Sequence, residues 1–410
     1  MNYFNNRSNP GTSQSTLIMP LLPYRSKPEE MESFSSWLAR LAAAYQITAF
    51  ELIQHLGGKE SARKLNVWNP DYLVAPTVLE QVAAGTGTTI DRCISTSLIP
   101  LSRTLGWNGL CTWRGADPRR AEWVLSNPYR IRRKSTIDLK IRVCSIGSSQ
   151  YCPECLADPP VYFRINWRIS LMTVCARHKR LLRSRCPHCL GDVYSPLSRS
   201  RLVRASVPNL RLCVDCGGDL RHEPHPDTPL SREAIDTLLR VQSQHLRLIE
   251  CLVALEDDLC FDYLRILSRL LRYLTTPAMV SNRALCRSVD AILLQKGLAR
   301  IPLPEYVAKM VGGFDYLPVS NRAGLIVSAV WLLGNWPKTH GLLDWEGWRM
   351  AHPLNAHSPP LPRWFTRPTP SGLSLDFSST RRTACAGTVP RFLTDEALPL
   401  CVVRKVHRLT

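Results

Sequence analysis

The chain has 410 residues, which is enough for roughly two or three domains with buried cores. Its hydrophobic fraction of 45% excludes wholesale disorder. Lys and Arg number 52 against 33 Asp and Glu, a net charge of +19. We therefore expect a polyanionic partner, with nucleic acid first and an anionic membrane surface second.

The N-terminus, MNYFNNRSNPGTSQSTLIMP, has neither the apolar core nor the cleavage site of a signal peptide. We expect residues 1–22 to be a disordered lead-in. The apolar run at 323–336 is too short to cross a bilayer. The sequence therefore predicts a cytoplasmic protein without a membrane partner.

Residues 23–110 are predicted to form a domain of short helices. In ESFSSWLARLAAAYQ, apolar residues recur at helical spacing and form one stripe that contains Trp37. The next segment, TAFELIQHLGG, begins with a capping box of Thr48 and Glu51 and has Gly57 at the expected C′ position. In TVLEQVAAGTG, Thr77 and Glu80 are the predicted cap pair and Gly85 the terminator.

A further short helix is expected at 91–98. Four capped helices with tight turns predict a helix-turn-helix-like domain. A small helical bundle that binds protein or simply packs fits the same pattern equally well. Residues 111–145 follow as a basic linker, in which apolar periodicity fades.

The segment 146–226 contains four pairs of possible metal ligands: Cys152 and Cys155, Cys175 and His178, Cys186 and Cys189, and Cys213 and Cys216. A CxxC turn places two thiolates at the separation that two corners of a tetrahedral Zn²⁺ site require, so two turns complete one site. Clustered cysteines in a reducing compartment hold metal more often than they form disulfides. We expect a tandem zinc-finger segment with two structural zinc ions per chain, because a full ligand set leaves no position for water.

Other histidines lie close to these pairs. His188, His222 and His225 could replace a cysteine, but we expect them to lie beside the ligands or to face solvent. The cysteines without a partner at ligand spacing are expected to be small buried residues.

The zinc segment is also cationic and aromatic. The candidate nucleic-acid or partner contacts are Arg164, Arg168, Arg177, Lys179, Arg180, Arg183, Arg185, Arg201 and Arg204. Tyr162, Phe163, Trp167 and Tyr194 are interleaved with them, and arginines near aromatic rings suit phosphate contacts and base stacking. The alternative is that Phe163 and Trp167 pack against the zinc knuckles, while the arginines form a solvated or protein-binding face.

Residues 227–410 are predicted to be a C-terminal helical domain. Helical apolar spacing occurs at 231–255, 261–274, 283–298 and 321–336, and one edge strand could end the chain. The fold class is therefore mainly α. No phosphate-binding loop, HExxH or G-x-S-x-G motif is present, so no catalytic residue is assigned; a nuclease or recombinase with dispersed acidic residues would leave no such local motif.

The stretch YCPECL…YFRINWRISLMTVCARHKRLLRSRCPHCLGDV resembles the zinc-finger core of the TniQ/TnsD family of transposon target-selection proteins. The upstream ESFSSWLARLA is similar to the N-terminal signature of that family. The resemblance implies an adaptor rather than an enzyme, and it assigns the eight paired Cys and His residues as metal ligands.

Family members recognise a target, either a DNA site or an RNA-guided CRISPR effector bound to it. They then recruit an AAA+ ATPase of the TnsC or TniB type, which brings in the transposase, and some form homodimers. We therefore expect a transposition adaptor that selects the target site. The alternatives are a zinc-dependent DNA-binding transcription regulator and the nuclease or recombinase.

Overall fold

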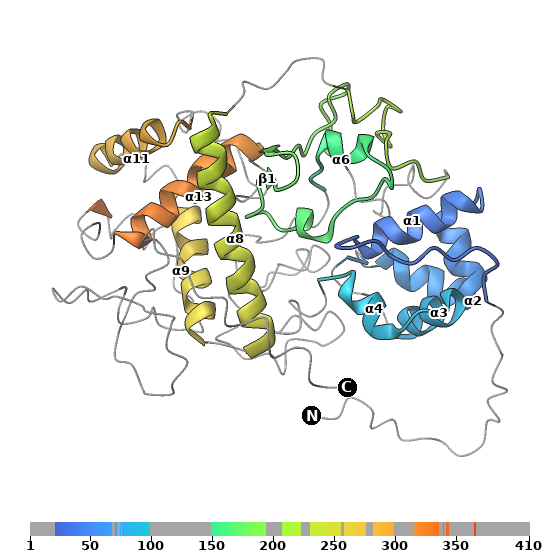
Figure 1. Ribbon diagram of the computed structural model, residues 1–410. Helices are drawn as coiled ribbons and strands as arrows, with labels where there is room; N and C mark the ends of the chain where they lie inside the picture. The colour runs from blue at the N-terminus through green and yellow to red at the C-terminus, as the bar shows by residue number, and fades with distance from the viewer. Residues whose placement is uncertain are drawn as a thin grey trace, which may run out of the picture.

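The computed structural model describes residues 21–67, 70–71, 74, 76–98, 149–193, 207–222, 230–255, 258–275, 282–298, 317–335 and the single positions 314, 339, 342, 343 and 365. The fold is mainly helical, as the sequence predicts (Figure 1). The predicted basic linker, the lead-in up to residue 20 and the C-terminal edge strand lie outside the described residues.

Four helices form the N-terminal part: α1 (Phe34–Ala44), α2 (Ala49–Val67), α3 (Pro76–Thr86) and α4 (Ile90–Ser95). α1 begins after Ser33, whose hydroxyl accepts the backbone N–H of Ser36. The predicted apolar stripe is buried, and Trp37 is fully enclosed. The capping box of α2 is confirmed, because the Thr48 N–H donates to Glu51 at 2.8 Å and the Glu51 N–H donates to Thr48 Oγ1 at 3.1 Å.

The glycines of this part differ from the prediction by one or two positions. The left-handed backbone occurs at Gly58 (φ +75°) and Gly87 (φ +65°), not at Gly57 and Gly85. Gly57 and Gly85 instead allow α2 and α3 to approach closely: a Cβ on Gly57 would lie 1.8 Å from Gln81 Oε1, and one on Gly85 would lie 2.3 Å from a Leu56 methyl. Gly87 lies directly after the end of α3, whereas Gly58 lies inside α2 and kinks that helix.

The N-cap of α3 is also corrected. The helix begins at Pro76, so Thr77 lies within its first turn rather than at the cap. Proline is favoured at a first helical position because its missing N–H would have no partner there.

The metal-binding segment lies between the N-terminal and C-terminal helices in Figure 1, where it is green. Its elements are α6 (Pro153–Ala157), the 3₁₀ helix η2 (Ile165–Arg168), β1 (Val174–Cys175) and β2 (Arg180–Leu181). The two strands pair antiparallel. Backbone hydrogen bonds join this segment to the start of α1: Ser33 N–H donates to the Phe163 carbonyl at 2.8 Å, and Ile165 N–H donates to that of Met31 at 2.7 Å.

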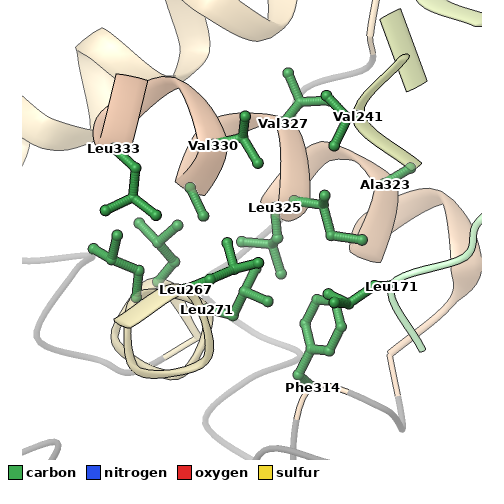
Figure 2. Packing of buried hydrophobic residues seen from close by; sticks show 14 of the residues in the cluster. Leu171, Val241, Leu267, Leu271, Phe314, Ala323, Leu325, Val327, Val330 and Leu333 are labelled. Atoms are coloured by element: carbon green, nitrogen blue, oxygen red, sulfur yellow. The ribbon is translucent and has the colours of Figure 1, made fainter. Parts of the chain in front are cut away.

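The C-terminal part consists of α8 (Arg232–Leu255), α9 (Asp258–Leu274), α11 (Arg283–Gln295) and α13 (Val319–Gly334). α13 is apolar nearly all round and is almost wholly buried, as expected of a central helix. Figure 2 shows Leu325 of α13 on the side of Leu267 and Leu271 of α9, and Val327 of α13 beside Val241 of α8. The helices of the described part include none long and apolar enough to cross a membrane.

Buried apolar residues of the metal-binding segment are shared between two clusters. Ile165, Ile169, Leu171, Met172 and Val174 belong to the core of the C-terminal helices. Tyr151, Phe163 and Trp167 surround the cysteines instead. The segment is thus packed against its C-terminal neighbours, while the domain boundaries predicted above stay predictions.

Candidate metal centres and the basic face

The first centre combines a helix start with a strand end. Cys152 is the N-cap of α6 and Cys155 lies within it, while Cys175 ends β1 and His178 lies in the turn before β2. The Cys155 and Cys175 sulfurs are 3.6 Å apart. His178 Nδ1 lies 3.2 to 3.7 Å from the three sulfurs.

The second centre is built from two similar turns. Cys186 Sγ lies 3.7 Å from Cys216 Sγ, and Cys189 Sγ lies 3.8 Å from Cys213 Sγ. The backbone N–H of His188 donates to Cys186 Sγ and that of Gly218 donates to Cys216 Sγ, each at 3.4 Å. The structure therefore groups all eight predicted ligands as two sets of four, with the ligand atoms of each set within 4.8 Å of one another.

These separations are those of a tetrahedral zinc site. With Zn–S bonds of about 2.3 Å, the sulfur–sulfur edges of a tetrahedron measure about 3.8 Å. The observed sulfur–sulfur distances of 3.6 to 3.8 Å match those edges. Both sets are compatible with zinc and provide four protein ligands each, which would leave no coordination position for a substrate or a water.

The cysteines of each set differ in the direction of their pKa shifts. The pKa of the Cys175 thiol is lowered, because the Cys152 and Cys155 thiols and the backbone N–H groups of the following turn donate to its sulfur. The pKa of Cys216 is lowered, chiefly by the backbone N–H of Gly218. The pKa values of Cys152 and Cys213 are raised, by neighbouring thiols at Cys152 and by burial at Cys213. Metals bind thiolates rather than thiols, so metal binding would displace protons from these sulfurs.

A carboxylate orients the histidine of the first centre. His178 turns Nδ1 toward the sulfurs, while its Nε2 lies 3.3 Å from Asp158 Oδ2. Such a partner fixes the ring and raises the basicity of the ligating nitrogen. Asp158 is itself held by Arg177 at 2.9 Å.

Residues 23–182 match the TniQ family model. This region of the chain, 160 of the 410 residues, is similar to TniQ. The match includes α1 to α4 and the whole first metal centre, and it ends before Cys186, the first ligand of the second centre. No curated protein matches the chain.

Two ion pairs with buried carboxylates lie within the region that matches TniQ, and local sequence patterns do not predict them. Glu32 is fully buried and accepts from Arg40 Nε at 2.8 Å and from its Nη2 at 2.7 Å. Asp71 lies 3.3 Å from Arg168 Nε, with both side chains 1% exposed. Asp71 also accepts the N–H and hydroxyl of Ser35. No spacing in the sequence relates Asp71 to Arg168, because the two residues are 97 positions apart in the chain.

Arg168 was predicted to contact nucleic acid, and its buried position corrects that prediction. Its guanidinium is buried against Asp71 between the metal-binding segment and the N-terminal helices. Phe163 and Trp167 are buried as well, and their rings contact edge to face at 6.0 Å. The alternative interpretation therefore holds for these two rings: they pack around the cysteines.

The remaining cations around the first centre differ in how they are held. Arg177 pairs with Asp158 and Arg180 pairs with Glu154, each at 2.9 Å, and Arg164 lies over the Tyr162 ring at 5.0 Å. These three arginines are therefore already occupied by neighbours in the same segment.

Three further cations lie along the chain from the first centre to the second. Lys179 and Arg185 are exposed, whereas Arg183 is half-buried and donates to the His222 carbonyl. Arg201, Arg204 and Tyr194 lie outside the described residues.

The extra histidines and cysteines behave largely as predicted. His188 and His222 are exposed and stack at a ring separation of 5.3 Å, beside the ligands of the second centre rather than among them. Cys93 is buried and Cys286 is partly buried. His225 and the cysteines at 111, 144, 385 and 401 lie outside the described residues, as do the side chains of the cysteines at 251 and 260.

Proposed function

We propose that this chain is a transposition target-selection adaptor with two structural zinc ions. It binds target DNA, or a target-bound RNA-guided complex, and recruits an AAA+ ATPase of the TnsC or TniB type, which brings in the transposase. The observation that carries the proposal is the TniQ match over residues 23–182, together with the two tetrahedral ligand sets.

The charge distribution assigns DNA contact to the metal-binding segment and not to the N-terminal helices. Residues 21–98 contain seven Lys or Arg against eight Asp or Glu, whereas residues 149–222 contain twelve against five. Phosphate contacts need a local excess of cations. The helices that resemble a helix-turn-helix are nearly neutral, which suits contact with protein better than contact with a polyanion.

Four cations of this segment are exposed in the described structure: Arg177, Lys179, Arg185 and Arg221. Arg177 and Arg221 pair with Asp158 and Asp219, so Lys179 and Arg185 are the candidates for contact with DNA. Lys179 has a left-handed backbone (φ +49°) in the turn that closes on the Cys175 carbonyl. Arg185 immediately precedes the ligand Cys186, and its backbone pairs with Asp192. Each metal set would therefore hold one of these side chains in a defined position.

The adaptor role needs two binding surfaces at once, and it does not need a catalytic metal site with an open coordination position. Two four-ligand sets stabilise short turns that could not bury a core of their own. The chemistry of transposition would then belong to the recruited ATPase and transposase, while this chain supplies recognition.

A retention experiment tests both halves of the proposal. Target DNA on beads is incubated with the chain and then with the AAA+ ATPase of the same transposon. We compare the wild type with the double variant Lys179→Asn, Arg185→Gln and with the matched control Arg25→Gln, Lys59→Gln, whose side chains are exposed on the N-terminal part. Asparagine is chosen at 179 because it tolerates a left-handed backbone.

The variant of the metal-binding segment should retain less DNA and less ATPase, and the slope of log K against log salt should fall by about two if each cation contacts one phosphate. The control should leave the slope unchanged. Equal slopes in both variants would contradict DNA contact at this face. Failure of the DNA-bound wild type to retain the ATPase would contradict the adaptor role.

A further inference from the structure

The two metal centres differ in how far solvent reaches their sulfurs. In the first centre all three cysteines are buried, and the side chain of His178 is 16% exposed. In the second centre Cys186 and Cys213 are buried, but Cys189 and Cys216 are exposed. The two centres therefore have similar distances between their ligand atoms, but only the second centre has cysteines that solvent reaches.

The surroundings explain this difference. Tyr151, Phe163 and Trp167 cover the first centre as part of an apolar cluster. Beside Cys216 the chain turns through Gly217, where a Cβ would meet nothing within 4 Å. Leu190, which follows Cys189, is 70% exposed. A small polar reagent can therefore reach the sulfurs of Cys189 and Cys216 from solvent.

Each exposed sulfur also contacts a buried one. Cys216 Sγ lies 3.7 Å from Cys186 Sγ, and Cys189 Sγ lies 3.8 Å from Cys213 Sγ. Two sulfurs in contact can form a disulfide once one of them has been oxidised.

We propose that Cys189 and Cys216 are oxidant-sensitive modification sites, at which a peroxide converts the second centre into disulfides and releases its metal. An exposed thiolate attacks one peroxide oxygen, the O–O bond breaks, and a sulfenic acid and water form. The neighbouring thiolate attacks the sulfenic sulfur, forming the S–S bond and releasing a second water. For the whole centre, four thiolates, two H₂O₂ and four protons give two disulfides and four waters, and the Zn²⁺ ion leaves.

The first centre should keep its metal under the same conditions, because its sulfurs are buried. The inference rests on the zinc occupancy proposed above and is independent of DNA binding or ATPase recruitment.

The test uses the purified full chain. Elemental analysis first establishes the zinc content, which should be about two per chain. Hydrogen peroxide is then added in the presence of a chromophoric zinc chelator, and the reacted cysteines are mapped by mass spectrometry. We expect one of the two zinc ions to be released and disulfides to form among the four cysteines of the second centre. The second zinc ion should be released only after unfolding.

The matched control is His178→Cys, which gives the buried first centre four sulfurs. If access decides the reaction, peroxide still releases one zinc ion from this variant. Release of both ions from the variant would show that the number of thiolates decides, and it would overturn the proposal. Release of none or both from the wild type would overturn it too. A zinc content below two before peroxide is added would instead contradict the occupancy on which the inference rests.

Discussion

At the scale of single residues, the most consequential feature is the pair of Asp71 and Arg168. Two charges that are each 1% exposed have lost nearly all their hydration, and only their mutual attraction and further hydrogen bonds offset that cost. Arg322 is buried in the same way: it donates to the Ser170 carbonyl and to Gln150 Oε1, each at 3.0 Å. Some arginines of this cationic chain are thus buried, and they bind side chains and carbonyl groups from distant parts of the sequence.

Asp71→Ala should lower the free energy of unfolding by about 3–5 kcal/mol, because it leaves a buried guanidinium without its carboxylate. Urea denaturation at neutral pH measures the change. The double variant Asp71→Ala, Arg168→Leu is the control and should recover much of the loss, since both charges are then absent. A single variant as stable as the wild type would show that the pair is not buried as described.

At the scale of elements, α8 connects the helical core to the metal-binding segment. Gln242 of α8 accepts the backbone N–H groups of Thr173 and Val174, each at 3.1 Å, and donates to the Val174 carbonyl at 3.0 Å. One side chain therefore satisfies the free edge of β1 beside the ligand Cys175. The same helix buries His245, which is 1% exposed and whose Nδ1 has no hydrogen-bond partner among the described residues.

Burial lowers the pKa of His245 from 6.5 to about 4. The unfolded chain therefore binds a proton as the pH falls through about 6.5, whereas the folded chain binds it only near pH 4. Stability should decrease between these values, by about 1.4 kcal/mol from pH 7.5 to 5.5. Urea denaturation of wild type and His245→Gln at both pH values measures this contribution.

Protonation of the cysteine ligands affects the wild type and the His245 variant alike, so the difference between them isolates the histidine. The variant should lose less stability on acidification. Identical losses in the two proteins would show that this imidazole is not desolvated.

At the scale of the whole molecule, the first metal centre connects parts that are far apart in the chain. Residues between its two ligand pairs bond to the start of α1, pair with Asp71 and contribute apolar side chains to the C-terminal core. Within the described residues the second centre is more local. Each of its turns is closed by its own backbone pairing, Arg185 with Asp192 and Leu212 with Asp219, and Tyr151 pairs with Arg183 beside the first of them.

Loss of the metal from the first centre should therefore destabilise more of the chain than loss of the metal from the second centre. Cys175→Ser should increase hydrogen exchange in residues 150–174 and in the parts of α1 and α8 that contact them. Cys213→Ser should confine the increase to residues 183–222. Hydrogen-exchange mass spectrometry compares the two variants. Equal and local changes would contradict the connecting role of the first centre.

Much of the molecule could be predicted from local sequence. Ligand pairs and helical stripes are short-range patterns, because a CxxC turn or a 3.6-residue period depends on a few neighbouring residues. The same reasoning misassigned Gly57 and Gly85, since local sequence cannot distinguish a glycine needed for a turn from one needed for a close approach between helices.

By itself, the sequence predicted the helical class and the four close pairs of candidate ligands, because both are encoded in contiguous residues. Only the tertiary structure decided which cations are exposed. Arg168 and Arg185 look equivalent in the sequence, yet one is paired with an aspartate 97 positions away and the other faces solvent. The desolvation of a charge depends on the residues that the whole fold packs around that charge. The same packing decides which of the two cysteine clusters an oxidant can reach.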